Sequence, residues 1–171
     1  MIKIAFIGAP STGKSTTAEE LRKISKKNVI EYISAGQTLK ECGYKINEDG
    51  TENTGKACIF FHKVSIKVLN LFSNYNDIVI LPRTIIDPIA YDDVRVSEDD
   101  VKEYFKNIDY IYFLPIETPI EIRKNRTSNE EYREKIQEKL LNLIEKYNLN
   151  VKTLKGSPKE KAKSIFSNLN S

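Results

Sequence analysis

Apolar residues in this chain gather in short runs, separated by longer stretches in which apolar positions recur at helical spacing. The runs 2–7, 78–81 and 110–114 are almost continuously apolar, which is typical of strands covered on both faces. Two weaker runs, 28–32 and 151–154, predict further strands, the last of them nearer an edge. Strands that alternate with helices indicate an α/β fold, in which a parallel sheet carries helices on both faces.

The helices are marked by periodicity and by their first residues. A hydroxyl residue followed three positions later by a carboxylate predicts helix starts at Thr118, Ser128 and Ser157, and in weaker form at Ser97. Segment 34–42 also looks helical, and the polar stretch 43–55 predicts a loop over the site. Two long helices are each expected to present one apolar face, made of Phe61, Val64, Val68, Leu71, Phe72 and Tyr75 in the first and of Ile136, Leu140, Leu143, Ile144 and Tyr147 in the second.

Composition adds limits to this picture. The 171 residues suit a single domain over 1–171, and 40% hydrophobic with 30% charged residues is ordinary for a globular protein. The apolar runs are too short to cross a membrane, and the early first strand argues against a signal peptide. Cys42 and Cys58 match no metal or redox spacing, so we expect reduced thiols and a cytoplasmic location. The net charge of +3 does not by itself predict nucleic-acid binding.

A glycine-containing loop joins the first strand to the first helix. It fits the pattern G-x-x-x-x-G-K-S, and its flanking strand and helix are the context that this P-loop motif requires. In such a loop, backbone N–H groups and the helix N-terminus cradle phosphates. Lys14 is expected to reach the β- and γ-phosphates, and the Ser15 hydroxyl to ligate Mg²⁺. The sequence therefore predicts a nucleoside triphosphate site made of Gly8, Ala9, Pro10, Ser11, Thr12, Gly13, Lys14, Ser15 and Thr16.

Several side chains are expected beside this loop, because ligands of parallel sheets bind beyond the carboxyl ends of the strands. Glu31 can accept a proton from a substrate hydroxyl or simply hold it, and the alternative is an exposed carboxylate without a role. Arg83 can contact substrate or phosphate, or form an ion pair at the sheet edge. Asp87 precedes a proline, which favours a helix N-cap over substrate binding. Tyr91 is a further substrate-binding candidate, with a structural role as its alternative.

Three arginines follow the fourth strand. Arg123 and Arg126 lie one helical turn apart, and Arg133 comes shortly after them. Phosphoryl transfer needs cations on the migrating charge, and guanidinium groups folded over the phosphates as a lid would supply them. The same spacing fits a solvated basic helix face. His62, the only histidine, lies in a long helix and is expected to be structural.

These blocks resemble a known family, the P-loop kinase domain that serves as ribosylnicotinamide kinase in bacterial regulators of NAD biosynthesis, with its phage-encoded ATPase/kinase relatives. Segment 4–21 resembles the family's strand, P-loop and helix, and 29–32 its second strand ending in a glutamate. Arg83 with the following aspartate and tyrosine is similar to the phage branch and to deoxynucleoside kinases. Segment 113–133, with Gly156-Ser157 beyond it, resembles the fourth strand, arginine lid, terminal helix and Gly-Ser loop.

The resemblance implies a strand order of 2-3-1-4-5, ATP with Mg²⁺, and a nucleoside or nucleotide acceptor near Glu31 and Arg83. Two positions depart from the family pattern. Pro82 stands where relatives have an aspartate close to the water shell of the metal. Ile33 and Ser34 follow the second strand where the family has an arginine, which favours the phage-like branch over nicotinamide riboside as the acceptor.

The sequence thus predicts an ATP- and Mg²⁺-dependent kinase that acts on a nucleoside or a (deoxy)nucleoside monophosphate. Its expected catalytic residues are Lys14, Glu31, Arg83, Arg123 and Arg126. One alternative is an NTP-binding regulatory or partner protein with slow hydrolysis. Another is a kinase of a modified base in DNA, although the lysines are dispersed rather than clustered. No membrane partner is expected, and the choice between monomer and homodimer stays open.

Overall fold

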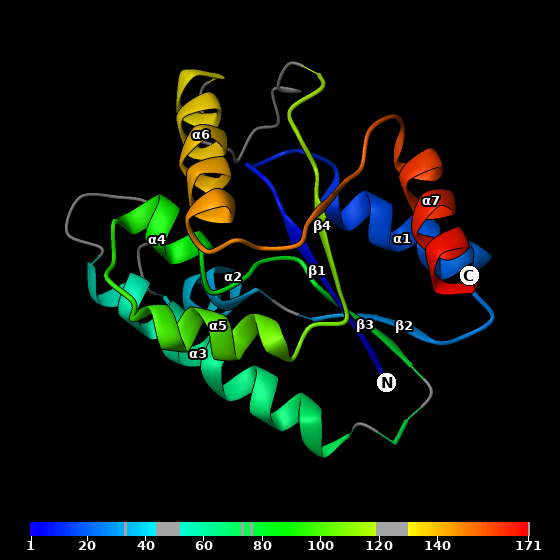
Figure 1. Cartoon of the computed structure of the whole chain (residues 1–171), viewed down its shortest axis with the longest axis horizontal. Helices are drawn as coiled ribbons and strands as arrows, with labels where there is room; N and C mark the ends of the chain where they lie inside the picture. Colours follow the sequence, from blue (N-terminus) through cyan, green and yellow to red (C-terminus); the bar gives the residue numbers. More distant parts are fainter. Residues whose placement is uncertain (33, 44–51, 73, 76, 119–129, 171) are drawn as a thin grey trace.

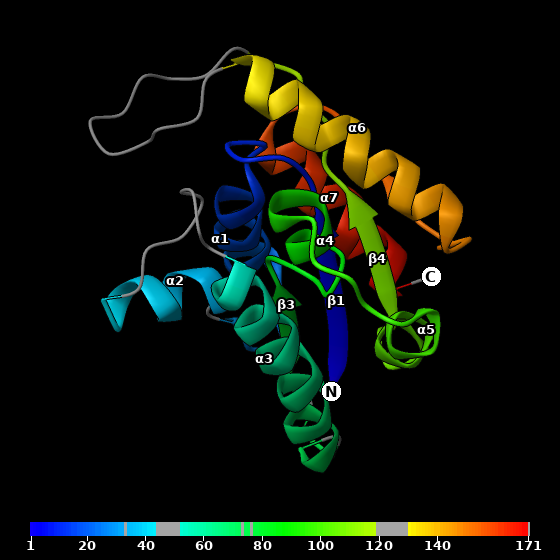
Figure 2. The same cartoon turned by 90° about the vertical axis from the view of Figure 1, so that its left-hand side faces the viewer.

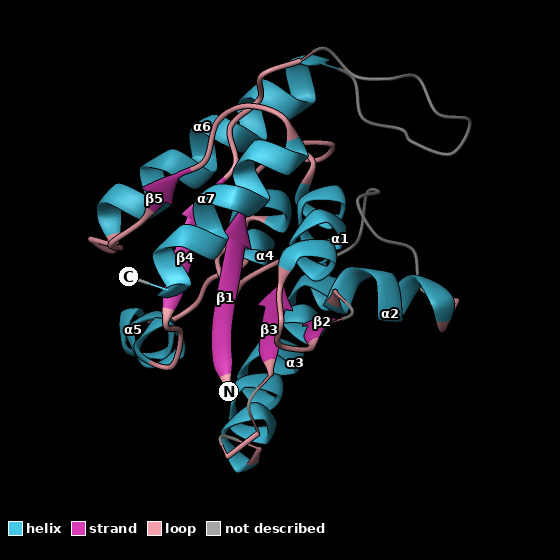
Figure 3. Cartoon of the chain, turned by 90° about the vertical axis from the view of Figure 1, so that its right-hand side faces the viewer, coloured by secondary structure: helices cyan, strands magenta, loops and turns pink. Residues whose placement is uncertain are grey.

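A five-stranded parallel sheet lies at the centre of the molecule (Figure 1). The computed structural model describes residues 1–32, 34–43, 52–72, 74–75, 77–118 and 130–170. The strands are β1 Ile2–Ile7, β2 Val29–Glu31, β3 Ile78–Leu81, β4 Tyr110–Phe113 and β5 Lys152–Thr153. They are arranged β2-β3-β1-β4-β5, side by side in Figure 3, and this confirms the predicted order and the edge position of the last strand.

Helices cover both faces of the sheet, as predicted (Figures 1 and 2). The helices are α1 Lys14–Ile24, α2 Ala35–Glu41, α3 Glu52–Leu71, α4 Asp87–Asp92, α5 Glu98–Lys106, α6 Glu130–Lys146 and α7 Pro158–Asn170. One hydrophobic cluster joins the sheet to α1 and α7, and a second joins its other face to α3, α4, α5 and α6. No helix in the described part of the chain is long and apolar enough to cross a membrane.

The strands feed both clusters because their side chains alternate between the two faces. Ile78 and Ile80 of β3 belong to the cluster under α1 and α7, whereas Val79 and Leu81 belong to the other. All four side chains are buried, which explains why the run is continuously apolar rather than alternating.

Several helix starts form as the sequence predicts. Ser97 accepts a hydrogen bond from the Asp100 N–H at 3.1 Å, and α5 begins directly after it. At α7, Glu160 accepts from the Ser157 N–H at 2.8 Å, and the Glu160 N–H donates back to the Ser157 hydroxyl at 3.4 Å. This is a complete capping box. The helices predicted to start at Thr118 and Ser128 would involve residues 119–129, which lie outside the described residues.

The apolar face expected of α6 is confirmed, since Ile136, Leu140 and Tyr147 are buried. The face expected of α3 is wrong. Most of its predicted members are exposed: Val64, Val68, Leu71, Phe72 and Tyr75. The helix instead buries the opposite side, made of Gly55, Cys58, His62, Ser65, Ile66 and Leu69.

Close packing at the start of α3 explains this orientation. A Cβ atom on Gly55 would lie 2.4 Å from the Val94 Cγ2 atom and 3.0 Å from the Asp92 side chain. A glycine lets this side of α3 approach Val94 and Asp92 closely, and the buried residues that follow at helical spacing face inward with it. Because α3 begins at Glu52, the loop predicted over 43–55 is wrong at that end; 44–51 lie outside the described residues.

His62 on this inner side should make stability depend on pH. Burial lowers its pKa to about 4, Asp87 works against that shift and Arg83 adds to it. The ring is neutral in the folded protein, so its contribution is complete above pH 6.5 and is lost as the pH falls toward 4. The loss should reach about 3 kcal/mol, measured by urea unfolding across this pH range.

The His62→Gln variant is the control for this prediction. It cannot titrate, so its stability should fall less between pH 6.5 and pH 4 than that of the wild type. The carboxylates of the protein lower the free energy of unfolding equally in both proteins as the pH falls. If the two proteins lose the same amount of stability, His62 makes no contribution and the prediction is contradicted.

Candidate active site

The loop between β1 and α1 has the backbone of a phosphate cradle. A Cβ atom on Gly8 would lie 2.6 Å from the Leu114 carbonyl oxygen, so a side chain is excluded there. Gly13 has φ +84°, a left-handed conformation that favours glycine, and it directly precedes α1. Ser11 also has a positive φ, at 61°. The two motif glycines therefore meet physical requirements of the turn, and α1 directs its N-terminus toward the loop.

Lys14 folds back over this loop. Its Nζ atom donates to the carbonyl oxygens of Gly8 and Ala9, each at 2.7 Å, and to the Thr12 hydroxyl at 3.3 Å. The side chain is buried, so its ammonium group lies against the loop rather than in solvent. An ammonium held by carbonyl oxygens can exchange these partners for phosphate oxygens without leaving the loop.

Arg83 connects the phosphate loop to a second group of residues at the end of β3. Its Nη1 atom donates to the Gly8 carbonyl oxygen at 3.1 Å, to Asp87 Oδ1 at 2.9 Å and to the Tyr91 hydroxyl. Its guanidinium carbon lies 4.8 Å from the centre of the Tyr91 ring. Burial works against the charge, but Tyr91 and Asp87 outweigh it and raise the pKa of Arg83. Arg83 thus stays cationic beside the loop.

Asp87 has a different local role from the predicted N-cap. It is the first residue of α4, and its Oδ2 atom accepts from the Thr84 N–H at 2.6 Å and the Thr84 hydroxyl at 2.9 Å. The carboxylate therefore reaches back to the turn before the helix while its other oxygen binds Arg83. This pattern fixes the orientation of Arg83, because its partner is itself held by two hydrogen bonds.

Glu31 lies at the end of β2, next to this group in the sheet, and pairs in register with Ile80 of β3. The side chain is half-buried, and no described residue forms a hydrogen bond or ion pair with it. The neighbouring Tyr32 ring packs against Phe61 of α3 at 6.0 Å between ring centres. A carboxylate beside aromatic rings at the carboxyl end of β2, with β3 between it and the strand that enters the phosphate loop, suits a ligand that carries a hydroxyl group.

Arg133, which sequence analysis noted only as part of a basic stretch, contacts the phosphate loop. It is 1% exposed and joins three segments. Its Nε atom donates to the Pro10 carbonyl oxygen of the phosphate loop at 3.0 Å. Its Nη1 atom donates to the Thr118 carbonyl oxygen at 3.3 Å and to both Glu130 oxygens at 2.9 Å. The signal for its burial is its spacing, since Arg133 lies on the apolar side of α6 that also presents Ile136 and Leu140.

The segment after β5 also approaches the phosphate loop. The Pro158 ring lies 3.9 Å from the position that a Cβ atom on Gly13 would take. The Gly156 N–H donates to Glu117 Oε1 at 2.8 Å, and the buried Lys161 pairs with Glu117 Oε2 at 2.6 Å. Glu117 thus joins the segment after β4 to the segment after β5 at the same edge of the sheet.

The structure brings together Lys14, Glu31, Arg83, Asp87 and Tyr91 around the carboxyl ends of β1, β2 and β3. Arg123 and Arg126 lie outside the described residues, so the predicted arginine lid stays a prediction.

The described side chains offer few ligands for a metal ion. Ser15 is exposed in the first turn of α1, and Pro82 takes the strand-end position of β3. No group of three or more histidine, cysteine, aspartate or glutamate side chains within the described residues could hold a metal. Mg²⁺ commonly binds through phosphate oxygens and water with few protein ligands, and the Ser15 hydroxyl fits that role.

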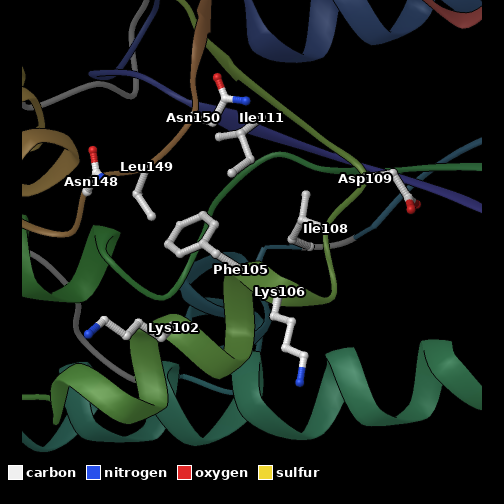
Figure 4. Close-up of a pocket in the computed structure, with 9 residues that line it drawn as sticks. All are labelled: Lys102, Phe105, Lys106, Ile108, Asp109, Ile111, Asn148, Leu149 and Asn150. Atoms are coloured by element: carbon white, nitrogen blue, oxygen red, sulfur yellow. The ribbon is translucent and has the colours of Figure 1, made fainter.

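A cavity of about 390 Å³ lies elsewhere, between α5 and the segment after α6 (Figure 4). Asp109, which lines it, directly precedes β4, so the cavity adjoins the amino ends of the strands. Ligand sites of open parallel sheets lie at the opposite, carboxyl ends. This cavity is therefore separate from the candidate active site.

Taken together, the sheet order and the phosphate loop define the fold of a P-loop nucleoside and nucleotide kinase. The chain belongs to the AAA domain family, whose model matches residues 3–161. A search of the curated proteins finds no match.

Solved structures show the same fold at low sequence identity. A deoxyadenosine kinase from M. mycoides with bound dATP is 18% identical, with a TM-score of 0.60 and full coverage of both chains (100%). The YorR protein from Bacillus subtilis, in complex with phosphorylated GDP, is 16% identical with a TM-score of 0.66, covering 98% of this chain and 95% of that one. The NadR protein in complex with NAD and AMP-PNP is 16% identical with a TM-score of 0.68. This chain is covered to 99% but spans only 49% of the NadR chain.

The contacts of Arg133 generate a prediction about the loop. The Arg133→Met variant should lose about 2 kcal/mol of stability because several charge-assisted hydrogen bonds disappear. Its affinity for a fluorescent ATP analogue should also fall about tenfold, because the Pro10 carbonyl is no longer held. Urea unfolding and fluorescence titration measure the two effects.

Arg22→Met provides a matched control for this experiment. Arg22 also donates to a backbone carbonyl oxygen, that of Val29 at 3.0 Å, but it lies at the far end of α1. Its loss should leave nucleotide affinity unchanged. If Arg133→Met binds the nucleotide as tightly as Arg22→Met does, Arg133 has no part in shaping the loop.

Proposed function

We propose that this protein is an ATP- and Mg²⁺-dependent kinase that phosphorylates a nucleoside or a (deoxy)nucleoside monophosphate. The observation that carries the proposal is the position of Arg83. One guanidinium nitrogen binds both the phosphate loop, at Gly8, and the Asp87–Tyr91 group at the next strand end. The donor site and a second polar site are therefore in direct contact, as transfer of a phosphoryl group between two ligands requires.

The second site has features that suit a nucleoside acceptor. Glu31 supplies a carboxylate that can accept a hydrogen bond from a sugar hydroxyl or take its proton. Aromatic rings flank the site, with Tyr32 against Phe61 on one side and Tyr91 against Tyr132 at 6.4 Å on the other. Flat aromatic surfaces near a carboxylate favour a ligand that combines a planar base with hydroxyl groups.

The phosphate loop would perform the donor side of the reaction. Lys14 and the backbone N–H groups of the loop would hold the β- and γ-phosphates in line with the acceptor. Mg²⁺ bound with ATP would bridge these phosphates and neutralise part of their charge. Arg83 would stabilise charge on the migrating group or bind a phosphate that the acceptor already carries. The solved structures with bound dATP and AMP-PNP support nucleotide binding by this fold.

A regulatory NTP-binding protein with slow hydrolysis is the main alternative. It would need only the donor half of the site. A coupled assay of ADP release, with ATP and Mg²⁺ against a panel of nucleosides and monophosphates, separates the two. Release that depends on one acceptor supports the kinase, whereas release that no acceptor alters supports the regulator.

The Lys14→Ala variant should be folded and lose nearly all acceptor-dependent ADP release in this assay. Removing the cation at the β- and γ-phosphates should lower the rate about a thousandfold. Lys23→Ala is the matched control, because Lys23 is an exposed lysine on the same helix. A Lys14→Ala rate within about tenfold of wild type would contradict the assigned role.

Glu31→Gln should separate catalysis from positioning at the acceptor site. The change keeps size and hydrogen bonding but removes the charge and most of the basicity. If Glu31 is a general base, kcat should fall about a hundredfold with ATP affinity nearly unchanged. If it only positions a hydroxyl, the KM for the acceptor should rise instead.

Glu19→Gln, on the exposed side of α1, is the control and should behave as wild type. If Glu31→Gln also matches wild type in kcat and in acceptor KM, the acceptor site lies elsewhere.

A further inference from the structure

The outer side of α3 carries an unusual concentration of exposed apolar side chains. Most of the large hydrophobic side chains that are exposed, among the described residues, lie on α3 or within a few residues of its C-terminal end. We call this surface the α3 stripe, and its members are Phe60, Val64, Val68, Leu71, Phe72 and Tyr75. Leu71 is 80% exposed and Phe60 70%. Figure 2 shows α3 on the outside of the molecule, with its outer side uncovered by any other labelled helix.

The size of the stripe exceeds what a soluble monomer normally shows. Its side chains expose on the order of 700 Å² together, whereas contiguous apolar patches above a few hundred Å² usually mark an interaction site. Two copies of the stripe would bury roughly 1,400 Å², which lies within the range of stable specific interfaces.

The order of residues along the stripe has an internal symmetry. Counting outward from Ile66, valines lie two residues away at Val64 and Val68, and phenylalanines lie six residues away at Phe60 and Phe72. When two identical helices pack antiparallel about a two-fold axis, residues equally far from the centre on either side face one another. The small valines would then meet at the centre, and the rings would pack at both ends.

The charged side chains beside the stripe are compatible with packing against a second copy of the helix. Lys63 points toward α5 and donates to Asp100 Oδ1 at 2.7 Å, so the flank of the stripe is partly neutralised. The first turn of α5 carries Glu98, Asp99 and Asp100. Asp100 lies beside Lys63 and Lys67 of α3, so the flank of the stripe carries both signs of charge rather than the single-sign field that would attract anionic lipid or nucleic acid.

From this surface we infer that two copies of the chain associate through the α3 stripe, with the two helices antiparallel. Val64 of one copy faces Val68 of the other, and the centre of contact lies at the level of Ile66. The interface lies on the outer side of α3, so it leaves the phosphate loop open. The inference is independent of the kinase reaction, and its test requires no substrate.

Sedimentation velocity over a wide range of concentrations tests the association. Wild type should show a species of twice the 19.6 kDa chain mass. The Val64→Glu/Val68→Glu variant should raise the dimer dissociation constant by about tenfold or more, because like charges would face each other at the centre. Circular dichroism and thermal unfolding confirm that the variant folds, since both positions are about 40% exposed.

Two further variants make the test specific. Leu141→Glu on α6 is the matched control, because Leu141 is 45% exposed and lies away from α3; it should dimerise as wild type does. Val64→Lys/Val68→Glu places opposite charges face to face in the antiparallel pair, so it should dimerise better than the double glutamate variant. Equal weakening in these two double variants would overturn the antiparallel arrangement.

The remaining outcomes would overturn the inference itself. One is a wild type that stays at 19.6 kDa at every concentration. Another is a dimer that Val64→Glu/Val68→Glu leaves intact, since a different surface would then hold it. Binding of monomeric wild type to phosphatidylglycerol vesicles, abolished by the same variant, would assign the stripe to a membrane instead.

Discussion

The structure depends on three consecutive backbone carbonyl groups, at residues 8–10 of the phosphate loop, that accept hydrogen bonds from cationic side chains. Lys14 binds the first two, Arg83 the first and Arg133 the third. These cations come from α1, from the β3–α4 connection and from α6, so one short loop fixes elements that are far apart in the sequence. Because each peptide unit is planar, holding the carbonyls of Gly8 and Pro10 also fixes the direction of the Ala9 and Ser11 N–H groups, whereas the unit between Ala9 and Pro10 carries no N–H. The donors that would face a phosphate are therefore arranged before it arrives.

The same contacts set the charge of the site. Asp87 neutralises part of Arg83 and Glu130 part of Arg133, and Lys14 donates to the carbonyl oxygens of Gly8 and Ala9. Three cationic side chains thus contact the loop, which favours a triphosphate. Pro82 adds no carboxylate at the end of β3, and Asp87 already binds Thr84 and Arg83. In the proposed reaction, Mg²⁺ would then be held mainly by the phosphates, so the metal and ATP would bind as one unit.

Local and periodic signals in the sequence predicted the features that depend on neighbouring residues. Strand runs, the phosphate loop and the caps at Ser97 and Ser157 need only a few adjacent positions, and the structure confirms them. Arg133 was underestimated because its partners lie at Pro10 and Thr118, far away in the chain. Long-range contacts of this kind leave only a weak trace in the sequence, here one charged residue on an otherwise apolar helix face.

The error on α3 has a clear physical origin. Periodicity identifies the apolar side of a helix, but contact distance decides which side faces the sheet. Gly55 permits a close approach to Val94 and Asp92 that a side chain would block. The side of α3 that continues with Cys58, His62 and Ser65 faces inward with it. The apolar outer side is then unexplained by the core of one chain, and a second copy explains it. The same helix reaches the candidate acceptor site, since Phe61 contacts Tyr32 next to Glu31. Association through the α3 stripe would therefore also stabilise one wall of that site, at a distance from the phosphate loop.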